Sequence, residues 1–173
     1  ILINCKRRQN IRSYYDRGNR RTMFVTGGKT LLKTGKTMTY PLSVGQRNIW
    51  DSELLKRGSP DNNICYRMNI KGRFVREILE KCVSLALKED SALHLRLTGG
   101  DESPVQYFAE YAEEHLPFFD FTSPDTGLPD FSVWEREKAE EPFSLFDCPL
   151  YYFALFKKAE NEGGLFIKFH HLV

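Results

Sequence analysis

From residue 39 onward, hydrophobic and polar positions follow the periods of regular secondary structure. Residues 43–57 carry apolar side chains at helical spacing, and Gly58 and Pro60 end the pattern. Ser43 and Gln46 have the spacing of a capping box, in which each side chain accepts a hydrogen bond from a backbone N–H group of the first turn. We therefore expect a helix that begins at Ser43 and stops before Gly58.

Two alternating strands and a second amphipathic helix are expected next. Residues 64–70 place apolar side chains at every second position, as a half-buried strand does, and residues 93–97 repeat this pattern. Between these strands, residues 74–89 should form a helix. The apolar face expected for that helix consists of Phe74, Ile78, Cys82 and Leu85.

The second half of the chain is expected to contain three strands, one charged helix and a long loop. The last two strands should form a hairpin, because alternating apolar residues flank a turn at residues 161–164 that is rich in Asn and Gly. Strands and helices are mixed, which indicates the α/β class. The expected elements are a strand at 105–109, a loop at 117–129, a helix at 131–141, and strands at 150–157 and 165–169.

Charge divides the 173-residue chain into two parts that its net charge of +2 conceals. Residues 1–37 hold ten Lys and Arg residues and one acidic residue, which gives +9, and they lack helical or strand periodicity. They are either a basic arm for an anionic surface or a segment upstream of the true start of the domain at Met38, with Met23 as a second possible start. We favour the upstream segment, with one domain at residues 38–173.

Several classes of protein do not fit this sequence. Residues 38–173 hold 15 basic and 22 acidic residues and carry −7, which argues against nucleic-acid binding. No apolar run approaches the roughly 18 residues of a membrane span, and the chain does not begin with a signal core. The four cysteines are widely spaced without a CxxC pair, and glycine-rich phosphate loops are absent. We expect a cytoplasmic protein that binds no nucleic acid and no membrane.

Two adjacent histidines, His170 and His171, stand at the end of the last expected strand. Successive strand residues point to opposite faces, so His170 should share a face with Lys168, and His171 should share one with Phe169. A neutral imidazole can accept a proton from an attacking amine, or hold that amine, near physiological pH. A structural role is the alternative. A metal site is disfavoured, because the other two histidines have no recognisable spacing from the pair.

Three motifs, in order, resemble the condensation domains of nonribosomal peptide synthetases. Residues 40–50, Y-P-L-S-V-G-Q-R-N-I-W, are similar to the opening motif of that family, in which Ser, Gln and Trp recur at this spacing. Residues 142–150, P-F-S-L-F-D-C-P-L, are similar to the P-F-D-L-x-x-G-P-L stretch. Residues 170–173, H-H-L-V, match the first four positions of the H-H-x-x-x-D-G signature. The resemblance covers residues 39–173.

This resemblance implies an α/β fold (an α+β sandwich) like that of chloramphenicol acetyltransferase, with this chain as part of the N-terminal lobe. In the family, donor and acceptor carrier protein domains deliver substrates on phosphopantetheine, and the acceptor amine attacks the donor acyl or peptidyl thioester. His171 would be the base or positioning residue, and His170 would support it. The domain would bind no metal or cofactor, and adenylation and carrier modules would belong to the same parent chain.

The sequence departs from the family at several positions. His94 stands where Arg is usual, either as a tolerated exchange of cations or as a weakened salt bridge, and we favour tolerance. Ser144 and Cys148 replace the usual Asp and Gly. The signature's Asp and Gly would lie beyond Val173, so we expect this piece alone to be inactive and its last strand to expose an unpaired edge. Two alternatives stay open: another acyltransferase of the same superfamily, and a non-catalytic carrier-protein docking module.

Overall fold

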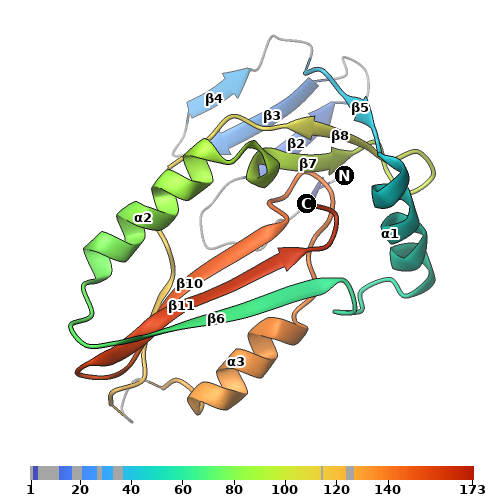
Figure 1. The fold of residues 1–173 in the computed structure, drawn as a ribbon. Helices are drawn as coiled ribbons and strands as arrows, with labels where there is room; N and C mark the ends of the chain where they lie inside the picture. Colours follow the sequence, from blue (N-terminus) through green and yellow to red (C-terminus); the bar gives the residue numbers. More distant parts are fainter. Residues whose placement is uncertain are drawn as a thin grey trace. The chain divides into compact units, whose positions relative to one another are not determined.

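The computed structural model describes residues 37–113, 115–123 and 127–173, and the backbone of four short strands nearer the N-terminus. Contacts divide the chain into two compact units, Ile1–Met38 and Thr39–Val173. The second unit contains all three motifs singled out above (Figure 1). Among the described residues, no helix is both long enough and apolar enough to cross a membrane.

The first unit contains a four-stranded antiparallel sheet that the sequence pattern did not predict, with the strand order β1-β2-β3-β4. Its strands are rich in Tyr, Phe, Val and Thr, which favour strands, but the apolar residues stand next to one another instead of alternating. The other residues before 37 lie outside the described part, so the upstream placement of this segment stays a prediction. The strands are β1 (Leu2–Ile3), β2 (Arg12–Asp16), β3 (Arg21–Thr26) and β4 (Lys29–Leu32).

The first helix of the second unit, α1 (Val44–Leu55), has the predicted capping box. Ser43 Oγ accepts a hydrogen bond from the Gln46 N–H at 3.2 Å, and Gln46 Oε1 accepts one from the Ser43 N–H at 2.9 Å. After the helix, Gly58 has φ of +75°, a conformation that glycine adopts without a steric penalty. The start and stop signals read from the sequence are therefore confirmed.

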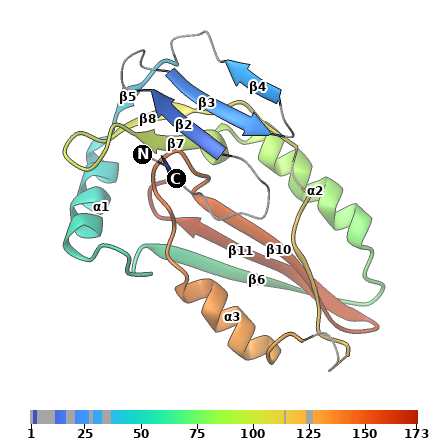
Figure 2. The ribbon, with the colours of Figure 1, turned by 180° about the vertical axis from the view of Figure 1, so that it is seen from behind.

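A four-stranded sheet with the order β6-β11-β10-β9 is the larger sheet of the second unit. Its strands β6, β11 and β10 lie side by side in Figures 1 and 2. Strand β11 runs antiparallel to both β6 and β10, whereas β9 runs parallel to β10. The loop predicted at 117–129 is partly wrong, because it contains β9, whose three residues are too few to show a period. The strands are β6 (Asn63–Lys71), β9 (Phe118–Asp120), β10 (Tyr151–Ala159) and β11 (Glu162–His170).

The position of β11 corrects one expectation. We expected the last strand to expose an unpaired edge, but β11 is paired on both sides. Its neighbour β6 comes from a much earlier part of the chain, so sequence order gave no indication of this pairing. The edges of the sheet belong to β6 and β9 instead.

The hairpin between β10 and β11 is confirmed, but its turn is shorter than predicted. Only Glu160 and Asn161 connect the strands, and Gly163 and Gly164 belong to β11. A Cβ atom on Gly164 would overlap the carbonyl oxygen of Met68 on the paired strand, and one on Gly163 would lie 2.6 Å from an aromatic ring. Both glycines therefore permit close packing within the sheet.

Helices α2 (Arg76–Glu89) and α3 (Phe131–Glu140) cover opposite faces of the larger sheet (Figure 1). Helix α2 packs against Leu155 and Leu165, whereas α3 packs through Trp134 against Phe156 and Phe166. Residues next to one another in β10 and β11 thus enter different apolar clusters. The sheet is therefore buried on both faces in its central strands, as an α/β layer arrangement requires.

The buried face of α2 differs from the predicted one. Val83 and Leu87 are buried, whereas Ile78 and Leu85 are 58% and 59% exposed and Cys82 is also exposed. Apolar residues cover more than half of the circumference of this helix. The predicted row and the buried row next to it therefore both have apolar side chains at helical spacing. The sequence pattern alone could not select the row that faces the sheet.

A smaller sheet with the order β5-β8-β7 shares an apolar cluster with α1. Leu42 and Trp50 from the opening motif, Leu150 from the middle motif and Leu172 from the histidine motif all belong to this cluster. The three motifs are therefore parts of one packed region. The elements are β5 (Tyr40–Pro41), the short 3-10 helix η1 (Ser91–His94), β7 (Leu95–Thr98) and β8 (Val105–Phe108).

Candidate active site

The two histidines lie where β11 leaves the larger sheet. His170 is the last residue of the strand and is 2% exposed, whereas His171 stands in the following turn and is exposed. The Phe143 ring contacts both His170, at 5.9 Å between ring centroids, and the Lys168 ammonium, at 4.7 Å. His170 and Lys168 thus share the face that the alternation predicted. The two imidazoles occupy different environments.

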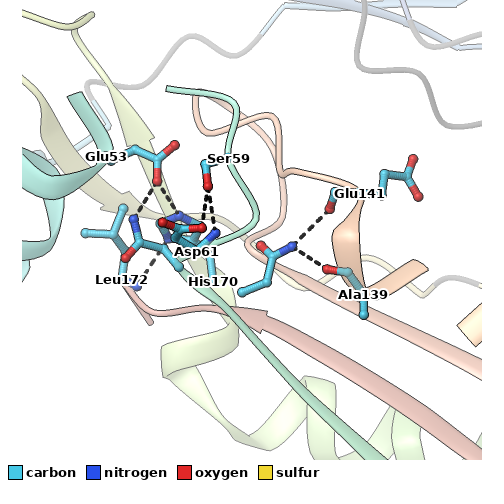
Figure 3. Close-up of polar contacts among 9 residues, drawn as sticks. Glu53, Ser59, Asp61, Ala139, Glu141, His170 and Leu172 are labelled. Atoms are coloured by element: carbon cyan, nitrogen blue, oxygen red, sulfur yellow. Dashed lines mark hydrogen bonds and ion pairs between the residues drawn. The ribbon is translucent and has the colours of Figure 1, made fainter. Parts of the chain in front are cut away.

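Both ring nitrogens of His170 are engaged (Figure 3). The backbone N–H of Leu172 donates to His170 Nδ1 at 3.3 Å, so Nδ1 is the unprotonated nitrogen. In the neutral ring the proton is then on Nε2, which donates to Glu53 Oε2 at 3.3 Å. The same carboxylate oxygen accepts a hydrogen bond from Asn62 Nδ2 at 2.7 Å.

The pKa of His170 agrees with this arrangement. Burial lowers the pKa of His170 below its ordinary value of 6.5, and the nearby His171 acts in the same direction. The hydrogen bond and the charge of Glu53 raise this pKa, but burial has the larger effect. His170 is therefore neutral at neutral pH, as the acceptor role of Nδ1 requires.

The backbone of the histidine turn, residues 170–172, is held by α1 and by the loop before β6. The N–H of His171 donates to the carbonyl oxygen of Asn62 at 2.9 Å, and Gln46 Nε2 donates to the carbonyl oxygen of Leu172 at 3.0 Å. Gln46 and Glu53 are seven residues apart, about two helical turns, and so lie on one face of α1. Helix α1 thus contacts the turn on both sides of its exposed residue.

These contacts explain why Ser, Gln and Trp stand at this spacing in the opening motif. Gln46 closes the capping box with Ser43 through its oxygen, while its nitrogen holds Leu172 and also donates to Gln106 Oε1 at 2.8 Å. Trp50, one turn later, is 3% exposed and packs in the same cluster as the Leu172 side chain. The motif therefore joins the start of a helix to the histidine turn.

The middle motif, residues 142–150, contacts the histidine turn and tolerates a side chain at the position where the family has Gly. It supplies Phe143 to the ring of His170. Asp147 has φ of +55°, and it is the only non-glycine residue with positive φ in the part of the chain that the structure describes. Cys148, at the family's Gly position, is buried with a negative φ, so a side chain there causes no backbone strain.

His94, at the position where the family usually has Arg, ties η1 to the end of α2. Its Nε2 lies 2.6 Å from the carbonyl oxygen of Leu87 and donates to it, and its ring stacks on Tyr111 at 6.2 Å between centroids. A neutral imidazole can make both contacts. Whether His94 is a tolerated exchange for the usual Arg stays a prediction.

The sequence pattern missed two residues of the site, Glu53 and Asn62. Glu53 carried a signal, because it is an acidic residue at i+3 from Trp50 and i+7 from Gln46, on the face that turns toward the core. Asn62 carried no such signal, because its contacts depend on the path of a loop. Among the described residues, no group of three or more His, Cys, Asp or Glu side chains is placed to hold a metal ion.

The family of the chain follows from comparison with known proteins. The condensation domain family matches residues 36–173. The chain belongs to the condensation domain family. This finding confirms the resemblance drawn from the three motifs. Members of this family form peptide or amide bonds in nonribosomal peptide synthesis.

Two curated relatives are peptide synthases of Bacillus subtilis (strain 168). One of them, a plipastatin synthase, is 32% identical over 139 residues, which cover 78% of this chain and 5% of that protein. The other, a surfactin synthase, is 30% identical over 141 residues, which cover 78% of this chain and 4% of that protein. The chain therefore spans about one twentieth of the length of these relatives.

Solved structures confirm the fold class. A mutant starter condensation domain of rhizomide synthetase, in complex with C8-CoA and Leu-SNAC, has 26% identity and a TM-score of 0.69. The similarity covers 78% of this chain and 31% of that chain. The first condensation domain of the CDA synthetase has a TM-score of 0.65 at 16% identity, which supports the fold alone. The α/β fold of part of a condensation domain is thus established.

Proposed function

We propose that residues 38–173 are the N-terminal part of a condensation domain that joins an acceptor aminoacyl amine to a donor acyl or peptidyl thioester. The amine nitrogen attacks the thioester carbonyl carbon, so that a C–N bond forms and the C–S bond breaks. The phosphopantetheine thiol of the donor leaves with the proton that the amine loses. Residues 1–37 precede this domain and take no part in the reaction.

One observation carries the assignment of roles: His171 is exposed beside a histidine whose two ring nitrogens are already bonded within the protein. His171 is therefore the imidazole that can meet the acceptor amine, as a base or as a positioning residue. His170 supports it by holding the backbone of the turn through its own hydrogen bonds. Because two tethered reactants held in line gain much of the required rate from orientation alone, positioning by His171 is a sufficient role.

The partners are a donor and an acceptor carrier protein domain, which present their substrates on phosphopantetheine. This proposal is supported by the curated relatives, which are peptide synthases that the chain matches over only a small part of their length. The domain itself then needs no bound cofactor. Adenylation and carrier modules in the same cytoplasmic parent chain complete the assembly.

The test uses the full protein that contains these residues, with a loaded acceptor carrier domain and either an aminoacyl carrier or an acyl-CoA as donor. Acyl-CoA is included because a similar starter domain has been solved with C8-CoA. We expect an amide product by mass spectrometry, and a fall in kcat of about 100-fold or more for His171→Ala. The matched control is His115→Ala, which removes an exposed histidine outside the turn and should leave kcat unchanged.

Three other results of this assay would contradict the proposed function. Transfer at the wild-type rate by His171→Ala would remove the role given to this residue. Transfer to a small free amine or alcohol, in preference to a carrier-bound amine, would assign the protein to another acyltransferase of the superfamily. Binding of carrier domains without any transfer would identify a docking module.

A further inference from the structure

Glu53 is the only buried acidic side chain among the residues that the structure describes, with 6% exposure. A buried carboxylate is costly unless hydrogen-bond donors surround it. The donors that meet its Oε2 atom are His170 Nε2 at 3.3 Å (Figure 3) and Asn62 Nδ2 at 2.7 Å. His170 belongs to the histidine turn, and the carbonyl oxygen of Asn62 accepts a hydrogen bond from the His171 N–H of the same turn. The position of Glu53 is thus tied to the site and not to the stability of α1 alone.

We propose that Glu53 is a positioning residue for the condensation reaction, which selects the Nε2–H tautomer of His170 and thereby fixes the backbone from which His171 projects. This inference rests on the function proposed above for His171. Glu53 does not itself reach the substrates in this assignment. It acts through His170 and Asn62.

The tautomer matters because of the backbone N–H of Leu172. With the proton on Nε2, the Nδ1 atom of His170 accepts from this N–H at 3.3 Å. With the proton on Nδ1, two donors would face each other in a place where Leu172 is 2% exposed and water cannot replace the lost partner. The peptide that joins His171 to Leu172 would then have to move. An acceptor at the Glu53 position excludes that tautomer.

Asn62 gives Glu53 a second route to the turn. Its side chain donates to Glu53 Oε2, and its carbonyl oxygen accepts from the N–H of His171 at 2.9 Å. The contact is hydrogen bonding rather than full ion pairing, since burial lowers the pKa of His170 and keeps the ring neutral. An uncharged acceptor of the same shape should therefore serve almost as well as the carboxylate.

The experiment compares Glu53→Leu, which removes the acceptor, with Glu53→Gln, which keeps an oxygen in the same place. Long-range proton–nitrogen NMR on protein with ¹⁵N-labelled histidine reports the His170 tautomer without substrate, and a steady-state assay separates kcat from KM. For Glu53→Leu we expect loss of the Nε2–H signature and a fall in kcat of about 10- to 100-fold with KM nearly unchanged. For Glu53→Gln we expect the wild-type tautomer and most of kcat. Asp51→Leu, at an exposed position on the same helix, is the control and should change neither.

An unchanged tautomer and unchanged kcat in Glu53→Leu would overturn the inference, as would a Gln variant that keeps the tautomer but loses activity as fully as Leu. If Glu53→Leu does not fold, Glu53→Asp replaces it, because the shorter side chain withdraws the oxygen while keeping the charge. If the wild-type protein forms no amide, the proposed function fails. The tautomer measurement would still decide whether Glu53 orders the turn.

Discussion

At the scale of single residues, burial separates two identical side chains. His170 lies inside the protein with both nitrogens bonded, and the next residue, His171, is exposed. A second proton on His170 would place a donor on Nδ1, where the Leu172 N–H now finds its acceptor. The folded state therefore resists protonation of this ring more than the unfolded chain does.

This resistance predicts how stability depends on pH. The unfolded chain takes up a proton on His170 near pH 6.5, whereas the folded protein does so only at lower pH. As pH falls below 6.5 the unfolded state binds more protons, so the free energy of unfolding should decrease. Urea unfolding at pH 7.5 and pH 5.5 measures this loss. The loss should be smaller in His170→Gln, and equal losses in both proteins would contradict the prediction.

At the scale of elements, the start of β11 is shaped by close contact with its neighbours. Gly164 pairs with Asn69 of β6, and a side chain at this position would meet the backbone carbonyl of Met68, which cannot rotate away. Strands β6 and β11 would have to separate to admit one. The same strand ends in the histidine turn, so its pairing with β6 bears on the site.

We therefore expect Gly164→Ala to lower the free energy of unfolding by about 2–4 kcal/mol. The matched control is Gly45→Ala in α1, where nothing lies within 4 Å of the added methyl group. There alanine should leave stability unchanged or raise it by up to about 1 kcal/mol, because alanine favours a helix over glycine. Thermal unfolding of both variants distinguishes them. A change of less than about 1 kcal/mol in Gly164→Ala would contradict the close approach of Gly164 to the Met68 carbonyl group.

Elements fixed by local chemistry could be predicted from the sequence, and those fixed by distant contacts could not. The capping box of Ser43 and Gln46, and the face that His170 shares with Lys168, follow from spacing within a few residues. The face predicted for His171 does not, because β11 ends at His170 and His171 lies in the turn. The pairing of β9, the buried row of α2 and the partners of Glu53 depend on segments far away in the chain. The family motifs identified the candidate histidines, but not the carboxylate that orients one of them.

At the scale of the whole second unit, β6 exposes large apolar side chains on one of its faces. Tyr66 and Met68 are 62% and 51% exposed, although their register partners in β11, Ile167 and Leu165, are packed in the cluster beneath α2. β6 is also an edge strand of its sheet. An apolar edge strand is a site for association between chains.

The 173-residue chain should therefore associate as its concentration rises, which sedimentation velocity can measure. Met68→Lys places a charge on the apolar face of the edge strand and should shift the chain toward monomer. Asn69→Lys adds the same charge on the opposite face of the same strand, at an exposed position, and should have a smaller effect. Equal effects would indicate that net charge, and not this face, controls association.

The interval between Gln46 and Glu53 sets the spacing of the two contacts that α1 makes with the histidine turn. Seven residues of a helix span about 10.5 Å and complete nearly two turns, so Gln46 and Glu53 project from the same side of α1. Gln46 can therefore contact Leu172 at one end of the turn while Glu53 contacts His170 at the other. One residue inserted between these positions would rotate the second contact by about 100° around the helix axis. Outward-facing residues of α1 can change freely, but its length between these two positions cannot. An exchange of domains between synthetases should place its junction outside this interval.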